Sequence, residues 1–342
     1  MSKKHARLED LLQRTGLLCA GHAFWHKIIP VKNARTLAAS FAAKVGRPAA
    51  SSVPLSEWSW FRIGGPADLL FRAETGREVR LAAAWAREQG VGFYVIGGGS
   101  NMLFDDEGFR GLIIKNDARG LDLRGEVVMA FAGTPLTALV EFLTNQAQGG
   151  LEFLAGIPGT VGGALCGNAG AFGRSIGEAV RDVDLLSSGG ETSVRSRAEM
   201  GFSYRRSLLK DAHHIVLGAR FRVEPGDPAS IKRQVEDYLK LRSGKHPCPG
   251  TACAGSYFKN PVQPDGTKLA AGRLLEQAGA KGLRVGDAAV FEGHANFLIN
   301  LGKATARDVR VLAAELKDRV RTAFGVELEE EVVYLPAASS MP

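Results

Sequence analysis

The feature that most constrains this chain is an uncharged stretch at 156–173, GIPGTVGGALCGNAGAFG, in which seven residues are glycine. Glycine permits positive φ and leaves the main-chain amides unobstructed by side chains. A second run, IGGGSN at 96–101, follows an apolar segment that predicts a strand. Successive exposed amides at such turns can bind a diphosphate. Either run alone is more often a tight packing loop, but two of them indicate a large anionic ligand.

The same runs argue against two common nucleotide sites. Neither contains the dinucleotide fingerprint G-x-G-x-x-G, and the chain has no G-K-[ST] for a phosphate-binding loop of the nucleotidase type. The formal net charge is +7, with Lys and Arg scattered among Asp and Glu. Because there is no basic tail and no nucleic-acid motif, we expect small polyanionic ligands such as nucleotides and no nucleic-acid partner.

The 342 residues, 45% of them hydrophobic, suffice for two or three modules with a sizeable core. The stretch 153–173 lacks charge, but its glycines and Pro158 are poor material for a membrane helix, so we expect no membrane span. Charged residues interrupt every apolar run near the amino terminus, so we expect no signal peptide. The cysteines form neither a C-x-x-C pair nor a disulfide framework, which favours a cytoplasmic protein with reduced thiols; we expect no metal site. The cysteines are Cys19, Cys166, Cys248 and Cys253.

Hydrophobic periodicity predicts mixed helices and strands from residue 61 onward, whereas the pattern in the first ~45 residues is too weak to assign. Thr134 is expected to cap a helix that Pro135 begins, and Thr305 with Asp308 resembles a capping box. The expected helices lie at 78–90, 134–150, 228–244, 268–279 and 305–325. The expected strands lie within 61–71, 91–99, 111–116, 126–133, 183–194 (a hairpin), 213–224 and 326–335.

Seven motifs occur in the same order as in a known enzyme family. They are FRIGGPA at 61–67, IGGGSN at 96–101, GIPGTVGG at 156–163, NAGA at 168–171, FSYR at 202–205, AGSYFKNP at 254–261 and HANF at 294–297. The chain resembles the UDP-N-acetylenolpyruvoylglucosamine reductases over roughly residues 53–335. Only 52 positions separate Tyr204 from Ser256, which resembles the shorter subclass that lacks an inserted tyrosine-bearing loop.

The resemblance implies an α+β fold, with a two-subdomain FAD-binding fold of the vanillyl-alcohol-oxidase type and a separate α+β substrate-binding domain. We expect five parts. They are an amino-terminal extension of unknown role at 1–45, FAD-binding subdomains at 46–115 and 116–226, the substrate-binding domain at 227–325, and a terminal strand that returns to the FAD domain at 326–342.

The activity implied is the NADPH-dependent reduction of UDP-N-acetylglucosamine enolpyruvate to UDP-N-acetylmuramate for peptidoglycan synthesis, with FAD as the hydride carrier. By the resemblance, Ser256 donates the proton, Arg205 lies beside the substrate carboxylate, and Glu331 is the terminal acid. Taken alone, each residue has a plainer interpretation: a serine in a glycine turn, a surface arginine, or one of four glutamates on a solvated strand edge. In an extended strand Glu331 would share a face with Glu329 and Val333.

Ligand contacts follow from the same resemblance. The FAD diphosphate would be held by Gly97, Gly98, Gly99, Ser100 and Asn101. The rest of the cofactor would be lined by Ile157, Pro158, Gly159, Thr160, Gly162, Gly163, Asn168 and Gly170. The substrate would be bound by Tyr204, Lys245, Lys259, Asn260 and Gln277, with Lys245 at the diphosphate and Lys259 also near the serine.

Two departures bear on substrate affinity: Phe172 stands where the family often has tyrosine, and Val333 replaces a frequent arginine. We expect a monomer. Two alternatives remain open at this point. One is another FAD-dependent oxidase or dehydrogenase of the same superfamily, and the other is a catalytically silent flavin-binding protein.

Overall fold

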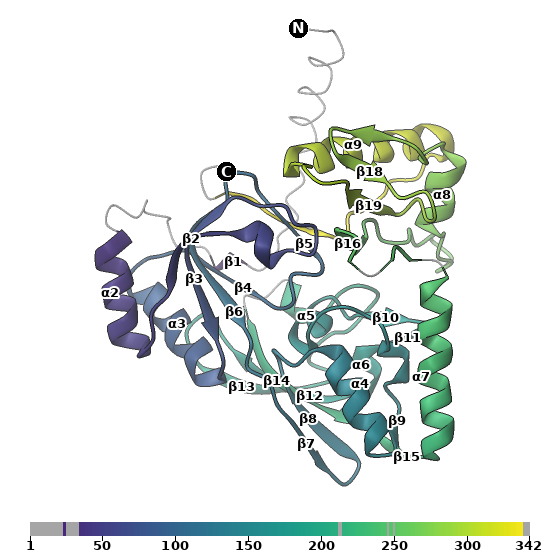
Figure 1. Cartoon of the computed structure of the whole chain (residues 1–342). Coiled ribbons are helices and arrows are strands. Elements are labelled where there is room, and N and C mark those ends of the chain that lie inside the picture. Colours follow the sequence, from purple (N-terminus) through teal and green to yellow (C-terminus); the bar gives the residue numbers. More distant parts are fainter. Residues whose placement is uncertain (1–22, 25–33, 211–213, 245, 249, 338–342) are drawn as a thin grey trace, which may run out of the picture.

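The computed structural model describes residues 23–24, 34–210, 214–244, 246–248 and 250–337, and three larger sheets organise them (Figure 1). The first sheet has the order β1-β4-β6-β3-β2, in which β4, β6 and β3 are parallel and the two edge strands are antiparallel. Its strands are β1 (Ala23–Phe24), β2 (Ala50–Pro54), β3 (Pro66–Ala73), β4 (Phe93–Ile96) and β6 (Phe109–Asn116).

Helices α2 (Ala34–Val45) and α3 (Gly76–Glu88) pack on the first sheet. α3 begins two residues before the predicted start at residue 78, because Thr75 and Glu78 form a capping box. Its buried residues recur at helical spacing and join the core with Phe41 of α2. Within the described residues, part of the unassigned amino-terminal extension is thus a helix that belongs to the core.

The second sheet is antiparallel, with the order β13-β12-β14-β8-β7. The hairpin predicted at 183–194 is confirmed by the pairing of β12 with β13. Its strands are β7 (Leu121–Arg124), β8 (Val127–Phe131), β12 (Val180–Leu186), β13 (Thr192–Ser196) and β14 (Ile215–Arg222). Helices α4 (Leu136–Asn145), α5 (Val161–Cys166) and α6 (Ile176–Ala179) share its core cluster.

The cap predicted for α4 is wrong. Pro135, not Thr134, occupies the N-cap position, and it forms no side-chain cap. The Thr134 hydroxyl instead accepts a hydrogen bond from the Gly120 amide at 3.1 Å and lies 3.2 Å from the Gly120 carbonyl. A contact 14 residues away in the chain therefore takes the hydroxyl that the local pattern assigned to the helix.

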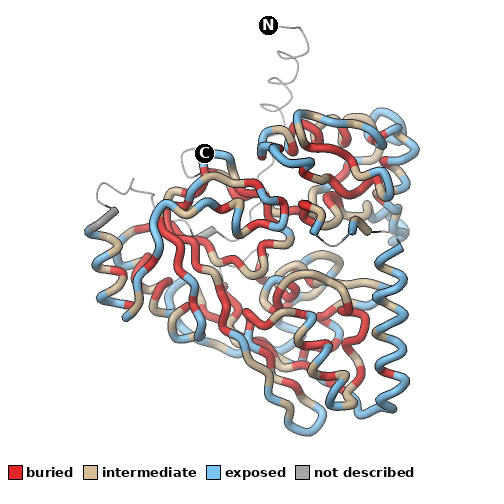
Figure 2. The backbone as a smooth tube through the Cα atoms, in the orientation of Figure 1, coloured by how far each residue is buried: buried red, intermediate tan, exposed pale blue. Residues whose placement is uncertain are grey.

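Each of the three larger sheets, with the helices packed on it, is called a unit and numbered as its sheet is. Helix α7 (Pro228–Ser243) runs along the edge of the second unit toward the third, and most of its surface is exposed (Figures 1 and 2). Asp227 caps it and Gly244 follows it, as the sequence predicts. The third sheet is antiparallel, with the order β16-β19-β18-β17. Its strands are β16 (Cys253–Ser256), β17 (Arg284–Val285), β18 (Ala288–Val290) and β19 (Phe297–Asn300). Helices α8 (Ala271–Gln277) and α9 (Ala306–Phe324) pack with it.

The end of the chain returns to the first unit. β20 (Val333–Leu335) pairs in parallel with β5 (Met102–Phe104), which follows the first glycine run. The long strand predicted at 326–335 is wrong, because only these last three residues form one. The preceding residues are instead held by the segment after β16: the Lys259 amide donates to Glu329 O at 2.8 Å.

The first and third units are bonded directly. The Asp106 carboxylate accepts hydrogen bonds from the amides of Ala306 and Arg307, at 2.7 and 3.1 Å, and so caps the start of α9 from outside. Phe61 lies in the core of the third unit. No helix in the described part of the chain is long and apolar enough to cross a membrane.

Candidate functional site

The first glycine run leaves the end of β4 and turns sharply at Gly99, where φ is +67°. A Cβ built on Gly99 would lie 1.9 Å from the carbonyl oxygen of Trp58. The Gly99 carbonyl in turn accepts a hydrogen bond from the Trp60 amide at 3.1 Å. Only glycine therefore fits at this position, because a side chain would meet the main chain of 58–60.

The second run packs against the first. A Cβ on Gly98 would lie 3.1 Å from the Cα of Gly159, and one on Gly97 would lie 2.4 Å from Thr160 Oγ1. Ser100 Oγ donates to the Pro158 carbonyl at 3.2 Å. The residues that meet here lie at least 58 positions apart in the sequence. The two runs thus form one continuous surface of main chain.

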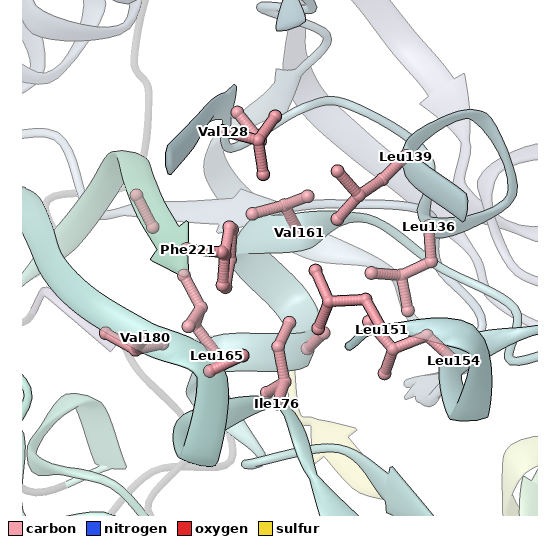
Figure 3. Packing of buried hydrophobic residues seen from close by; sticks show 14 of the residues in the cluster. Val128, Leu136, Leu139, Leu151, Leu154, Val161, Leu165, Ile176, Val180 and Phe221 are labelled. Atoms are coloured by element: carbon pink, nitrogen blue, oxygen red, sulfur yellow. The ribbon is translucent and has the colours of Figure 1, made fainter. Parts of the chain in front are cut away.

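Helix α5 anchors the second run. Thr160 is its N-cap, and its hydroxyl accepts a hydrogen bond from the Gly163 amide at 3.5 Å. A Cβ on Gly162 would lie 3.0 Å from that of Ala132, so glycine lets the helix lie close to the second sheet. Figure 3 shows Val161 and Leu165 of α5 within the apolar core beside Phe221 of β14.

The hydrogen-bond inventory of the first run indicates an anion site. The amides of Gly98, Gly99, Ser100 and Asn101 donate to no other residue that the structure describes. Main-chain amides in folded proteins are nearly always satisfied, by protein groups or by solvent and ligands. Four consecutive free donors at a turn with positive φ are the arrangement that binds phosphate oxygens. The residues expected at the FAD diphosphate therefore fit that group.

Glu331 is the point at which four chain segments meet. Its amide donates to Tyr257 O at 2.8 Å, and its carbonyl accepts from Asn101 Nδ2 at 3.0 Å. Its Oε1 lies 2.7 Å from Arg205 Nε, as an ion pair without the alignment of a good hydrogen bond. Burial raises the pKa of Glu331 and outweighs the opposing effect of Arg205, Lys210 and Lys259. The carboxyl accordingly takes up a proton at higher pH than an exposed glutamate.

Arg205 lies at the tip of a tight turn that Ser203 and Arg206 close through two main-chain hydrogen bonds of 3.0 and 3.1 Å. Its φ of +54° is rare for a residue with a side chain and costs on the order of 1 kcal/mol. Arg205 Nη1 donates to the Gly170 carbonyl at 3.4 Å. The side chain is thereby held between the second glycine run and Glu331.

Ser256 ends β16, where the register with β19 shifts and Gly255 has a φ of +76°. It is half-buried, and its hydroxyl forms no hydrogen bond to any residue in the described ranges. The next residue, Tyr257, binds the Glu331 amide. The structure therefore brings Arg205 and Glu331 together and puts Ser256 next in sequence to Tyr257, whose carbonyl accepts the hydrogen bond from the Glu331 amide.

The remaining predicted residues lie around this point. Asn168 is buried and links two segments: Nδ2 donates to Ser203 O at 2.8 Å, and Oδ1 accepts from the Gly177 amide at 3.0 Å. The Tyr204 hydroxyl accepts from the Asn260 amide at 3.1 Å, and Asn260 Oδ1 accepts from the amide of Ala271 in α8. Asn260 therefore fixes the local fold, whatever else it binds.

Lys259 forms an ion pair with Glu329. Gln277 lies exposed at the end of α8, and no hydrogen bond joins its side chain to the Glu331 site within the described ranges. Lys245 lies outside the described residues. Phe172, at the hairpin of β10 (Gly170–Ala171) and β11 (Arg174–Ser175), stacks on Tyr238 of α7 with ring centroids 4.3 Å apart.

Two cations were missed from the sequence. Lys210 interacts electrostatically with Lys259, Cys166, Glu331 and Glu329, and burial lowers its pKa. Arg242 of α7 packs against Gly156 and beside Arg205. Neither position carries a signal in the sequence, because its significance depends on segments distant in the chain.

Comparisons with known proteins give matches to two protein-family descriptions. Residues 67–194 match the family described as "FAD binding domain", and residues 247–335 match "UDP-N-acetylenolpyruvoylglucosamine reductase, C-terminal domain". A relative of that reductase name from Solibacter usitatus is 41% identical over 83% of this chain and 96% of its own length. One from Syntrophus aciditrophicus is 39% identical over 82% and 89%.

A solved structure is also similar. The crystal structure of UDP-N-acetylenolpyruvylglucosamine reductase from Thermus caldophilus has a TM-score of 0.70 and 35% sequence identity, covering 83% of this chain and 98% of that one. The predicted α+β fold with an FAD-binding domain is confirmed.

Proposed function

The chain belongs to the UDP-N-acetylenolpyruvoylglucosamine reductase family, and on that premise we propose that Arg205, Ser256 and Glu331 carry out its reaction. It is an FAD-dependent oxidoreductase that uses NADPH to reduce UDP-N-acetylglucosamine enolpyruvate to UDP-N-acetylmuramate, a peptidoglycan precursor. The assignment of these three residues to the reaction rests on one observation, the meeting of four chain segments at Glu331. Through its amide, carbonyl and carboxylate, this residue connects the serine segment, the first glycine run and Arg205.

When bound, FAD would supply the hydride, taken from NADPH, that no amino-acid side chain can provide. The amides of 98–101 would hold its diphosphate, and the packed second run would line the rest of the cofactor. The substrate is an enol ether conjugated to a carboxylate, so negative charge builds on that carboxylate when hydride reaches the vinyl carbon. The Arg205 guanidinium binds this charge as a fork of N–H donors.

Ser256 Oγ–H donates the proton to the carbon next to the one that receives hydride. A serine hydroxyl is a weak acid, so the alkoxide left behind needs nearby positive charge. Lys259, three residues along, and Lys210 supply it. Glu331, whose pKa is raised by burial, can hold a proton at the carboxylate end of the substrate. Tyr204 and Asn260 position the substrate, as do Lys245 and Gln277.

The division into parts belongs to the same proposal. Subdomains 46–115 and 116–226 bind FAD, 227–325 bind substrate, and the end of the chain returns to the cofactor side; the three sheets and the pairing of β20 with β5 support this division. We further propose that the protein acts in the cytoplasm as a monomer and thereby contributes to cell shape and division. Phe172 and Val333 lower the affinity for substrate relative to relatives with tyrosine and arginine there.

The alternative of an oxidase with covalently attached flavin is disfavoured by Cys166. This thiol lies within the second glycine run, but burial raises its pKa to about 11, so it is a poor nucleophile at neutral pH.

An anaerobic titration tests the reductase against both alternatives, another FAD-dependent oxidase or dehydrogenase and a catalytically silent flavin-binding protein. NADPH should bleach the bound flavin, and UDP-N-acetylglucosamine enolpyruvate should restore the colour with one product formed per flavin. Bleaching that substrate does not reverse would contradict the proposed function.

A further inference from the structure

Arg242 lies in the last turn of α7 with its side chain against the second glycine run. A Cβ on Gly156 would lie 3.1 Å from Arg242 Cδ and 3.2 Å from Nε, so glycine makes room for the arginine. The side chain is half-buried, and its guanidinium has no hydrogen bond or ion pair to any residue within the described ranges. A partly buried cation without a partner is costly unless an anion joins it.

Two of the cations around the Glu331 site are already paired with carboxylates. Arg205 is paired with Glu331, and Lys259 is paired with Glu329. Arg205 lies close enough to Arg242 to lower its pKa, in addition to the larger effect of burial. While Glu331 is ionised, the Arg205–Glu331 pair carries no net charge. Arg242 then adds a positive charge next to Arg205, in addition to that of Lys210, which acts on Glu331 from another segment.

We propose that Arg242 binds the enolpyruvyl carboxylate of the substrate together with Arg205. The inference rests on the proposed function and names a second guanidinium for the same group. While Glu331 is ionised, Arg205 alone poorly balances a substrate carboxylate that gains further negative charge during reduction. Two guanidinium groups on one carboxylate, one of them unpaired, provide that balance.

The test compares Arg242→Gln and Arg242→Lys with Arg233→Gln, an exposed arginine on the same helix, in the FAD-loaded full-length protein. Two ligands are titrated: UDP-N-acetylglucosamine enolpyruvate, and UDP-N-acetylglucosamine, which has the same nucleotide but no carboxylate. We expect Arg242→Gln to weaken binding of the first by roughly 10- to 100-fold and leave the second within about twofold. Arg242→Lys should recover part of the loss, and Arg233→Gln should bind both ligands as wild type does.

A kinetic readout separates binding of the carboxylate from a structural role. Because the charge grows in the transition state, Arg242→Gln should lower kcat as well as raise KM for substrate, while bleaching by NADPH and FAD affinity stay unchanged. Equal weakening of both ligands would overturn the inference in favour of a nucleotide or diphosphate contact. Loss of FAD affinity, a lowered melting temperature, or unchanged substrate binding would overturn it too. If wild-type flavin is not reoxidised by substrate, the proposed function itself fails, which is a different result.

Discussion

Replacing Gly99 by alanine tests, with a single local change, whether the first glycine run binds the cofactor. At a φ of +67° a side chain costs about 1–2 kcal/mol in any surroundings. The new Cβ would also lie 1.9 Å from Trp58 O, so the two main chains must separate by about 1 Å to relieve the overlap. That shift displaces the free amides on either side of residue 99 from the phosphate oxygens. Each charge-assisted hydrogen bond lost is worth about 1.5–3 kcal/mol.

Gly125 provides the matched control, because its φ is +57° but a Cβ there would meet nothing within 4 Å. Gly125→Ala should lower the melting temperature by a few degrees, as expected for about 1 kcal/mol in a chain of this size, and bind FAD normally. Gly99→Ala should destabilise more and weaken FAD binding by roughly 10- to 100-fold, measured by flavin fluorescence titration of the apoprotein. If the two variants had equal melting temperatures and equal FAD affinities, the proposed contact between the glycine run and the cofactor would be refuted.

Three further predictions concern separate parts of the molecule. Ser256→Ala should still accept hydride from NADPH, because that step needs no protein acid, but should form product at least ~100-fold more slowly in a single-turnover assay; product formation at the wild-type rate would remove the serine from the mechanism. Asp117 is buried, yet Lys115, Arg72 and Arg119 lower its pKa from 3.8 to about 2 against the effect of burial. Because the folded pKa lies below the unfolded one, Asp117 contributes about 2 kcal/mol that is fully present above pH ~4 and is lost as the pH falls toward ~2. Asp117→Asn should flatten the pH dependence of urea unfolding in that window, and an unchanged slope would count against the assignment. Asp106→Ala removes the outside cap of α9 and should lower the free energy of unfolding by about 1–2 kcal/mol, whereas an unaltered urea midpoint would show that this cap is dispensable.

Local signals in the sequence were sufficient where the structure depends on near neighbours. Asp227 before Pro228, and Thr305 with Asp308, start α7 and α9 where predicted, because an N-cap acts within three residues. Thr134 was misassigned because Gly120, on another segment, takes its hydroxyl. The terminal strand was overextended because the main chain near Glu329 bonds to the segment after β16 instead of forming a ladder with period two.

The candidate site was predictable by resemblance but not by local pattern. The alternation of glutamates near the end of the chain would put Glu331 on the same face as exposed neighbours, yet Glu331 is half-buried against Arg205, whereas Glu329 is largely exposed. That difference arises because Asn101 and Tyr257 fix the Glu331 main chain from two sides. Arg242 was missed for a similar reason: that it has no acidic partner among the described residues is a property of the assembled charges, which no single segment reveals.

A crystal structure of a slowly reacting variant such as Ser256→Ala, with FAD and UDP-N-acetylglucosamine enolpyruvate bound, would test most directly whether the glycine run and the residues around Glu331 form the active site. We predict that the amides of 98–101 lie within hydrogen-bond distance of the FAD diphosphate, ~2.7–3.2 Å. We also predict that the substrate carboxylate lies on Arg205, with its vinyl group between the flavin and residue 256. A diphosphate bound elsewhere, or a vinyl group remote from residue 256, would contradict the account.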